Sequence, residues 1–167
     1  MRLYKRIFAT CMAVLFVLLD TSVLPFSGIN MLYCPRMALL AVITIALLLG
    51  RTQGILYGAV AGVLMDITVS IPMGLTSIVY TVAGFVSGYL GRKSRYALLS
   101  SIISPIISML IYELAQAGYY IANAGIFSGD MFLMMLIRIL IGTFLVQILY
   151  LLFNLVLKTK HSRYARR

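Results

Sequence analysis

The sequence contains no tryptophan, one histidine, two cysteines and only four acidic residues among its 167 positions. The histidine, His161, lies in the basic C-terminal stretch, and Cys11 and Cys34 have neither the spacing of a zinc site nor the number needed for a disulfide framework. The sequence contains neither a Gly-x-Ser-x-Gly nucleophile motif nor a phosphate-binding loop. These absences predict that the chain is not an enzyme and that it has no metal site and no cofactor.

Charged residues are scarce as well. They make up 11% of the chain, against about 25% in ordinary soluble domains, whereas 62% of the residues are hydrophobic. A soluble protein of this composition would expose apolar patches well beyond the few hundred Å² or so that soluble monomers usually expose. We therefore predict a multi-pass membrane protein. The net charge of +10 comes mainly from basic residues beside the hydrophobic runs, which favours anionic lipids over nucleic acid as their partner.

The hydrophobic runs predict an all-α bundle of six transmembrane helices in a single domain, because a helix needs about 20 apolar residues to cross a bilayer. The expected spans are 7–24, 32–50, 53–71, 73–90, 96–122 and 131–157, followed by a basic tail at 158–167. The second run has a clean apolar part only over 37–50, so it either crosses the bilayer tilted or enters it partly. The first run resembles a signal peptide, but it holds Asp20 and no cleavage site follows it, so we interpret it as a retained span.

The basic residues indicate the orientation of the bundle. With six spans and a cytoplasmic N-terminus, twelve of the fourteen Lys and Arg residues fall on the cytoplasmic side, Arg36 falls outside, and Arg138 lies within a span. This asymmetry follows the positive-inside rule and predicts that both termini are cytoplasmic. The twelve are Arg2, Lys5, Arg6, Arg51, Arg92, Lys93, Arg95, Lys158, Lys160, Arg163, Arg166 and Arg167.

Four ionisable residues lie within the expected spans, all in their outer halves: Asp20, Asp66, Glu113 and Arg138. Charges at membrane depth usually face the bundle interior or mark a functional site. Glu113 and Arg138 lie at similar depth and could pair, with Asp66 as a rival partner for Arg138. The group is therefore an internal ion pair, a polar site, or a contact for another protein's helix. No carboxylate or histidine lies in the inner halves, which disfavours a proton relay.

Glycines recur at spacings of four in the third and fourth runs. The third run contains Gly54, Gly58 and Gly62, and the fourth contains Gly84 and Gly88. This spacing places glycines on one helix face and allows another helix to approach closely. The approaching helix could belong to this chain or to a partner. Pro72 and Gly74 indicate a tight turn between the two runs, because proline cannot continue the preceding helix and glycine tolerates unusual backbone angles.

The segments GILYGAVAGVLMD at 54–66, IPMGL at 71–75 and GFVSGYL at 84–90 resemble the rod shape-determining protein MreD family. Cys34-Pro35-Arg36 resembles the family's Pro-Asp start of the second span, although Arg36 replaces the acidic residue. The resemblance implies a multi-pass protein of the bacterial inner membrane that serves as a non-enzymatic scaffold of the cell-wall elongation machinery. It implies binding to an MreC-like single-span protein and, through it, to an MreB-like actin homologue, a RodA-type polymerase and a transpeptidase. The glycine face would be the contact with the MreC-like partner.

The same resemblance implies a fold, because MreD is similar to the six-helix substrate-binding subunits of energy-coupling-factor (ECF) vitamin transporters. Such a subunit is therefore the alternative function. Ala9 and Ala13 resemble the small-residue motif with which these subunits dock their energising partner, although the pair also fits ordinary packing. The expected outer connections are short, whereas a transporter subunit would need a substantial outer loop over its ligand. We therefore expect the scaffold rather than the transporter subunit.

Overall fold

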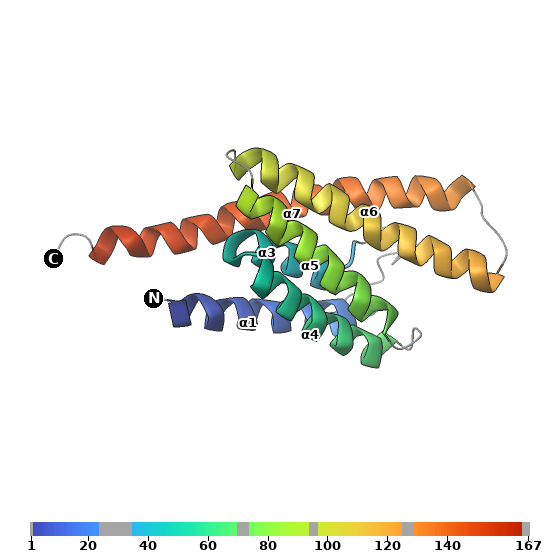
Figure 1. Ribbon diagram of the computed structural model, residues 1–167, viewed down its shortest axis with the longest axis horizontal. Coiled ribbons are helices and arrows are strands. Elements are labelled where there is room, and N and C mark those ends of the chain that lie inside the picture. Colours follow the sequence, from blue (N-terminus) through green and yellow to red (C-terminus); the bar gives the residue numbers. More distant parts are fainter. Residues whose placement is uncertain (1, 24–34, 70–73, 94–96, 125–128, 165–167) are drawn as a thin grey trace.

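The computed structural model describes residues 2–23, 35–69, 74–93, 97–124 and 129–164, and within these ranges all regular structure is helical. The elements are α1 (Arg2–Leu18), the π-helix η1 (Leu19–Val23), α3 (Met37–Leu49), α4 (Arg51–Val69), α5 (Leu75–Lys93), α6 (Ala97–Ala124) and α7 (Gly129–Tyr164). The expectation of an all-α bundle is confirmed. The start of α1 and the end of α7 lie at the same end of the bundle, and we call the opposite end the distal end (Figure 1).

Two of the described helices are long and apolar enough to cross a bilayer, over Leu99–Tyr119 and Phe132–Phe153. Shorter apolar helical stretches cover Ala9–Ser22, Met37–Leu49 and Leu75–Gly91. With 13 residues, α3 is about 20 Å long at 1.5 Å per residue, which is less than the roughly 30 Å hydrocarbon core.

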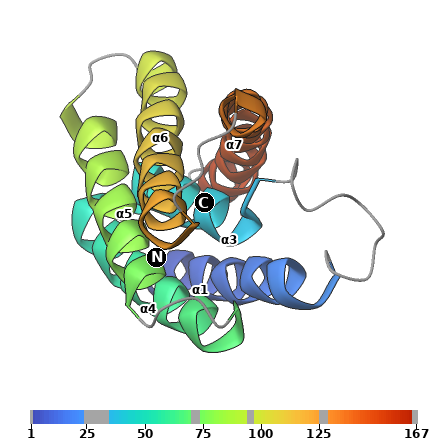
Figure 2. The same ribbon diagram turned by 90° about the vertical axis from the view of Figure 1, so that its right-hand side faces the viewer.

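The short helix α3 lies at the centre of the bundle. Figure 2 looks along the bundle and shows α3 between the other helices, and it contacts α1, α4, α5, α6 and α7. Residues 38–46 are all buried. A helix that is apolar on every face is suited to burial on every side. Gly50 ends α3 with a positive φ of 94°, and α4 begins at the next residue, so α3 and α4 form a tight hairpin.

The most extensive contact between described helices joins α4 to α5, and the glycines lie in it. A Cβ atom on Gly58 would meet the backbone of Tyr80, and one on Gly54 would meet the backbone of Gly84. We call this contact the glycine seam. Gly62 and Gly88 complete it, against Ser77 and Arg51 respectively. The glycine face is thus covered by the neighbouring helix of the same chain.

Asp66 closes the distal end of the glycine seam by capping α5. Its carboxylate accepts hydrogen bonds from the backbone N–H groups of Gly74 (3.0 Å), Thr76 (3.2 Å) and Ser77 (3.1 Å). The first N–H groups of a helix have no partner within it, and the helix dipole favours a negative charge there. Gly74 has a φ of 104°, which glycine adopts without strain. Pro72, the other expected turn residue, lies outside the described residues.

Replacing Asp66 with alanine removes one acceptor from three N–H groups, so we expect lower stability. Loss of a single N-terminal cap costs about 0.5–2 kcal/mol, and the loss of Asp66 should reach the upper part of that range. Thermal unfolding in detergent, followed by circular dichroism, measures the effect. Thr68→Ala is the matched control, because the exposed Thr68 hydroxyl bonds only to carbonyls of its own helix. Equal melting temperatures of the two variants would contradict the capping role.

The glycine seam predicts a sharp contrast between two Gly→Leu substitutions. Leucine at Gly58 must push α4 away from the backbone of α5, so we expect loss of the folded monodisperse protein. Leucine at Gly118, in the C-terminal part of α6, should be tolerated because nothing lies within 4 Å of an added Cβ there. Size-exclusion chromatography of both variants after detergent extraction checks this. Recovery of folded Gly58→Leu at the level of Gly118→Leu would show that the seam tolerates separation.

Candidate functional site

Polar side chains from four helical elements and from the residue before α3 gather toward the distal end of the bundle. The structure brings together residues that the sequence had singled out and residues that it had not. We call the group the distal cluster. Its members are Asp20 of η1, Arg36 before α3, Tyr80 of α5, Tyr112, Glu113 and Gln116 of α6, and Arg138 of α7.

Asp20 binds the N-terminus of α3. Its carboxylate oxygen accepts a hydrogen bond from the Ala38 N–H at 3.3 Å, and the aspartate is almost fully buried. Arg36 precedes the helix in extended conformation and offers no side-chain cap of its own. Asp20 therefore provides from another part of the chain the negative charge that a buried helix N-terminus favours. Arg36 carries the opposite charge close by, so the two charges offset each other.

Tyr112 connects Arg36 to α6. The Arg36 Nε donates to the Tyr112 hydroxyl at 3.2 Å, and the Gln116 Nε2 donates to the same oxygen at 2.8 Å. With two donors on its oxygen, the Tyr112 hydroxyl still has its own proton to give. The ring of Tyr80 meets the ring of Tyr112 edge-on, with centroids 5.9 Å apart.

Tyr80 is fully buried at 0% exposure, and its hydroxyl has no hydrogen-bond partner among the described residues. Buried hydroxyl groups almost always have a partner in folded proteins, and unpaired ones are costly. The Tyr80 hydroxyl is therefore a polar atom available to a bound molecule or to water.

Glu113 and Arg138 complete the distal cluster. A single guanidinium nitrogen of Arg138 lies 3.3 Å from both carboxylate oxygens of Glu113. The Glu113 side chain is 6% exposed and that of Arg138 is 24% exposed, so the arginine is the member that remains reachable. The rival partner of Arg138 named by the sequence, Asp66, is occupied at the start of α5.

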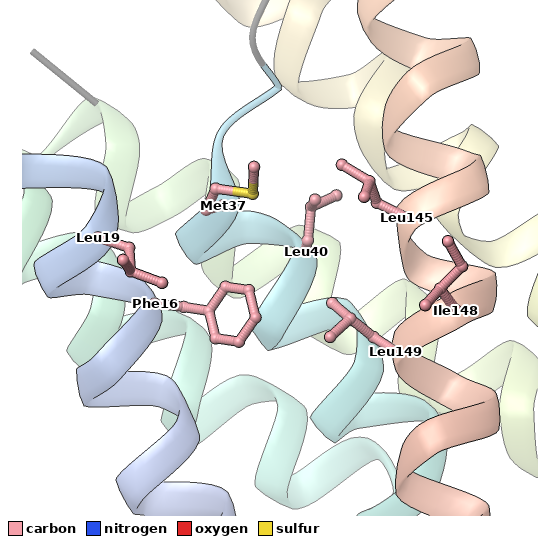
Figure 3. Close-up of a pocket in the computed structure, with 7 residues that line it drawn as sticks. All are labelled: Phe16, Leu19, Met37, Leu40, Leu145, Ile148 and Leu149. Carbon is pink, nitrogen blue, oxygen red and sulfur yellow. The ribbon is translucent and has the colours of Figure 1, made fainter. Parts of the chain in front are cut away.

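An apolar pocket with a volume of about 280 Å³ adjoins the distal cluster. It lies between α1, α3 and α7, and Figure 3 shows its side chains facing a common space. Two lining residues are sequence neighbours of the distal cluster, because Leu19 precedes Asp20 and Met37 follows Arg36. The seven lining residues are Phe16, Leu19, Met37, Leu40, Leu145, Ile148 and Leu149. A molecule with an apolar planar part and a polar edge fits such a combination of pocket and cluster.

Ala9 and Ala13 are 1% and 8% exposed. They pack with Ile45 of α3 and Tyr57 of α4, so this face of α1 is turned into the chain. Among the described residues, no group of three His, Cys, Asp or Glu side chains could hold a metal ion.

Arg36, Tyr80, Tyr112 and Gln116 were not among the residues that the sequence predicted for a site. The spacing of Tyr112 and Gln116, four apart on one helix and next to Glu113, was an available signal. The hydrogen bond from Arg36 to Tyr112 joins residues 76 positions apart, so no local sequence pattern predicts it.

A comparison with protein families identifies the ECF-type riboflavin transporter, S component, whose family model matches residues 6–159. Searches of curated proteins and of solved structures gave no match.

The match corrects the resemblance to MreD and the function drawn from it. Assignment to a cell-shape scaffold of peptidoglycan elongation is wrong, and so are its expected partners: the MreC-like protein, the MreB-like actin homologue, the RodA-type polymerase and the transpeptidase. The physical reason lies in what the resemblance rested on. Its segments around α4 and α5 encode a close helical hairpin with a capped turn, which is a packing device that unrelated bundles can share.

The family match covers α1 to α7, from the first turn of the first helix to the last apolar turns of the seventh, and it implies a multi-pass membrane protein. The chain belongs to the S-component family of ECF-type riboflavin transporters.

Proposed function

We propose that this chain is the membrane-embedded substrate-binding component of an ECF transporter and that it captures riboflavin. The observation that carries the proposal is the family match over residues 6–159. In such a transporter the S component works with the ATPases and the transmembrane T component of the ECF module, so those proteins are the partners we propose. The chain itself then needs no catalytic machinery, because ATP hydrolysis resides in the partner.

The chemistry of the distal end supports riboflavin as the ligand. Riboflavin has a flat fused ring system with a methylated apolar edge, a hydrogen-bonding pyrimidine edge and a chain of hydroxyl groups. The apolar pocket suits the methylated edge, because burial of apolar surface is favourable and its lining offers no polar atom. The unpartnered Tyr80 hydroxyl and the partly exposed Arg138 can bond to the polar edge or to the hydroxyl chain.

We propose that the bundle crosses the bacterial inner membrane six times with both termini in the cytoplasm. The start of α1 and the end of α7 lie at the same end of the bundle (Figure 1). With six alternating spans, twelve of the fourteen basic residues fall on the side of the N-terminus. The distal cluster then opens toward the outside, where a scavenged vitamin arrives. The short α3 is compatible with this topology, since helices of the same chain surround it and it need not meet the lipid along its whole length.

Filling the pocket should weaken riboflavin binding. Tryptophan at Leu149 places an indole in the pocket, and we expect the Kd for riboflavin to rise at least about tenfold, equivalent to about 1.4 kcal/mol. Leu151→Trp on the same helix is the matched control, because Leu151 is 54% exposed and lies outside the pocket. Quenching of flavin fluorescence during titration of the detergent-purified protein measures both. Failure of the unaltered chain to bind riboflavin would refute the proposed substrate.

Removing only the Tyr80 hydroxyl should separate binding from folding. Tyr80→Phe keeps the ring against Tyr112 and loses no hydrogen bond within the described chain, so we expect an unchanged melting temperature. Loss of a hydrogen bond worth about 0.5–1.5 kcal/mol should raise the Kd for riboflavin roughly two- to tenfold. Tyr57→Phe is the control with the opposite pattern, because the Tyr57 hydroxyl bonds to Thr10 at 2.8 Å. An unaltered Kd in Tyr80→Phe would remove Tyr80 from the site.

A further inference from the structure

A second group of buried polar side chains lies along α6, on the side of the distal cluster that faces the chain termini. Ser100, Ser101, Ser104 and Ser108 are all buried, in the first half of α6, whose other residues are apolar. Residues four apart share a face, so three of these serines form a row that continues through Tyr112. We call this row and its neighbours on α5 and α7 the serine seam.

The serine seam is hydrogen-bonded at both ends. Toward α5, the hydroxyls of Ser108 and Ser87 are 2.8 Å apart, and Ser108 also lies 3.3 Å from the Ala83 carbonyl. Toward α7, the Ser101 hydroxyl donates to the Gln147 Oε1 at 3.2 Å. This second bond holds the Gln147 carboxamide beside the same stretch of α6.

Between these bonds, three buried polar atoms have no partner among the described residues: the hydroxyl oxygens of Ser100 and Ser104 and the Nε2 of Gln147. Exchanging the oxygen and nitrogen of the Gln147 amide would still leave one of the two atoms without a hydrogen-bond partner among the described residues. Serine and threonine in a helix usually bond to the carbonyl four residues earlier. Thr44 and Thr143 do so in this chain, at 2.8 and 2.7 Å, whereas the Ser104 hydroxyl does not.

We propose that ordered water is bound in the serine seam by Ser100, Ser104 and Gln147, and that it bridges α6 to α7. Buried waters typically make about three hydrogen bonds to polar groups that lack other partners, and the seam offers three such atoms. Elsewhere on the α6–α7 contact, Gly142 leaves room for the Met109 side chain, which an added Cβ would meet. Lipid cannot replace water in the serine seam, because the hydrocarbon chains offer no hydrogen bonds to these polar atoms.

A double-mutant cycle tests whether Ser104 and Gln147 share one water. Ser104→Ala and Gln147→Met should each lower the melting temperature, by roughly 2–4 °C. The double variant should lose little more than the worse single variant, because the bridge is already broken. The control cycle pairs Ser104→Ala with Thr143→Ala, whose hydroxyl bonds to its own helix, and the two effects should add. Additive losses in the first cycle, or a higher melting temperature in Ser104→Ala, would overturn the proposal.

A high-resolution density map distinguishes a water bridge from a direct contact, which would also couple the two residues. The proposal expects a density peak within hydrogen-bond distance of both the Ser104 hydroxyl and the Gln147 carboxamide in the unaltered protein. The peak should be lost in Ser104→Ala. A direct bond between the two side chains, with no peak between them, would overturn the proposal.

Discussion

The structure depends on one constraint, which is that α3 is buried over residues 38–46, starting from its first turn. A helix inside a bundle can bury its side chains freely, but the unpaired N–H groups of its first turn need acceptors that water does not supply there. Asp20 meets this need from η1, and its charge in turn requires the neighbouring Arg36. Arg36 extends the network to Tyr112, and Tyr112 to Gln116. The polar end of the proposed ligand site is thus formed by the same residues that cap the central helix and balance the charge of that cap.

The parts of this architecture that follow from the sequence are those governed by local patterns. Apolar runs predict the helices, and glycines four residues apart on successive runs favour a close antiparallel pair such as α4 and α5. The carboxylate of Asp66 lies eight residues before Gly74, so the capped turn is also local. Glu113 and Arg138 lie on consecutive helices at similar depth, and the structure has them 3.3 Å apart.

What the sequence does not reveal depends on contacts between distant segments. Which of several apolar helices occupies the centre is decided by the packing of all of them, and the shortness of α3 is only a weak hint. The pocket joins Phe16 to Leu149, and every residue around it is an ordinary apolar residue of a membrane helix. The family assignment from sequence was wrong for a related reason. It relied on the most distinctive local segment, the α4–α5 hairpin, whereas the match that identifies the family extends over residues 6–159.

Tyr80 belongs to two parts of the molecule at once. Its backbone is the surface against which Gly58 rests, while its ring lies against Tyr112 in the distal cluster. Substitutions among the helix-packing residues of α4 would therefore move a group that we propose to contact the ligand. A change of vitamin specificity at Tyr80 would therefore be coupled to a change in the α4–α5 spacing during evolution. Helix packing and the choice of substrate do not vary independently in this bundle.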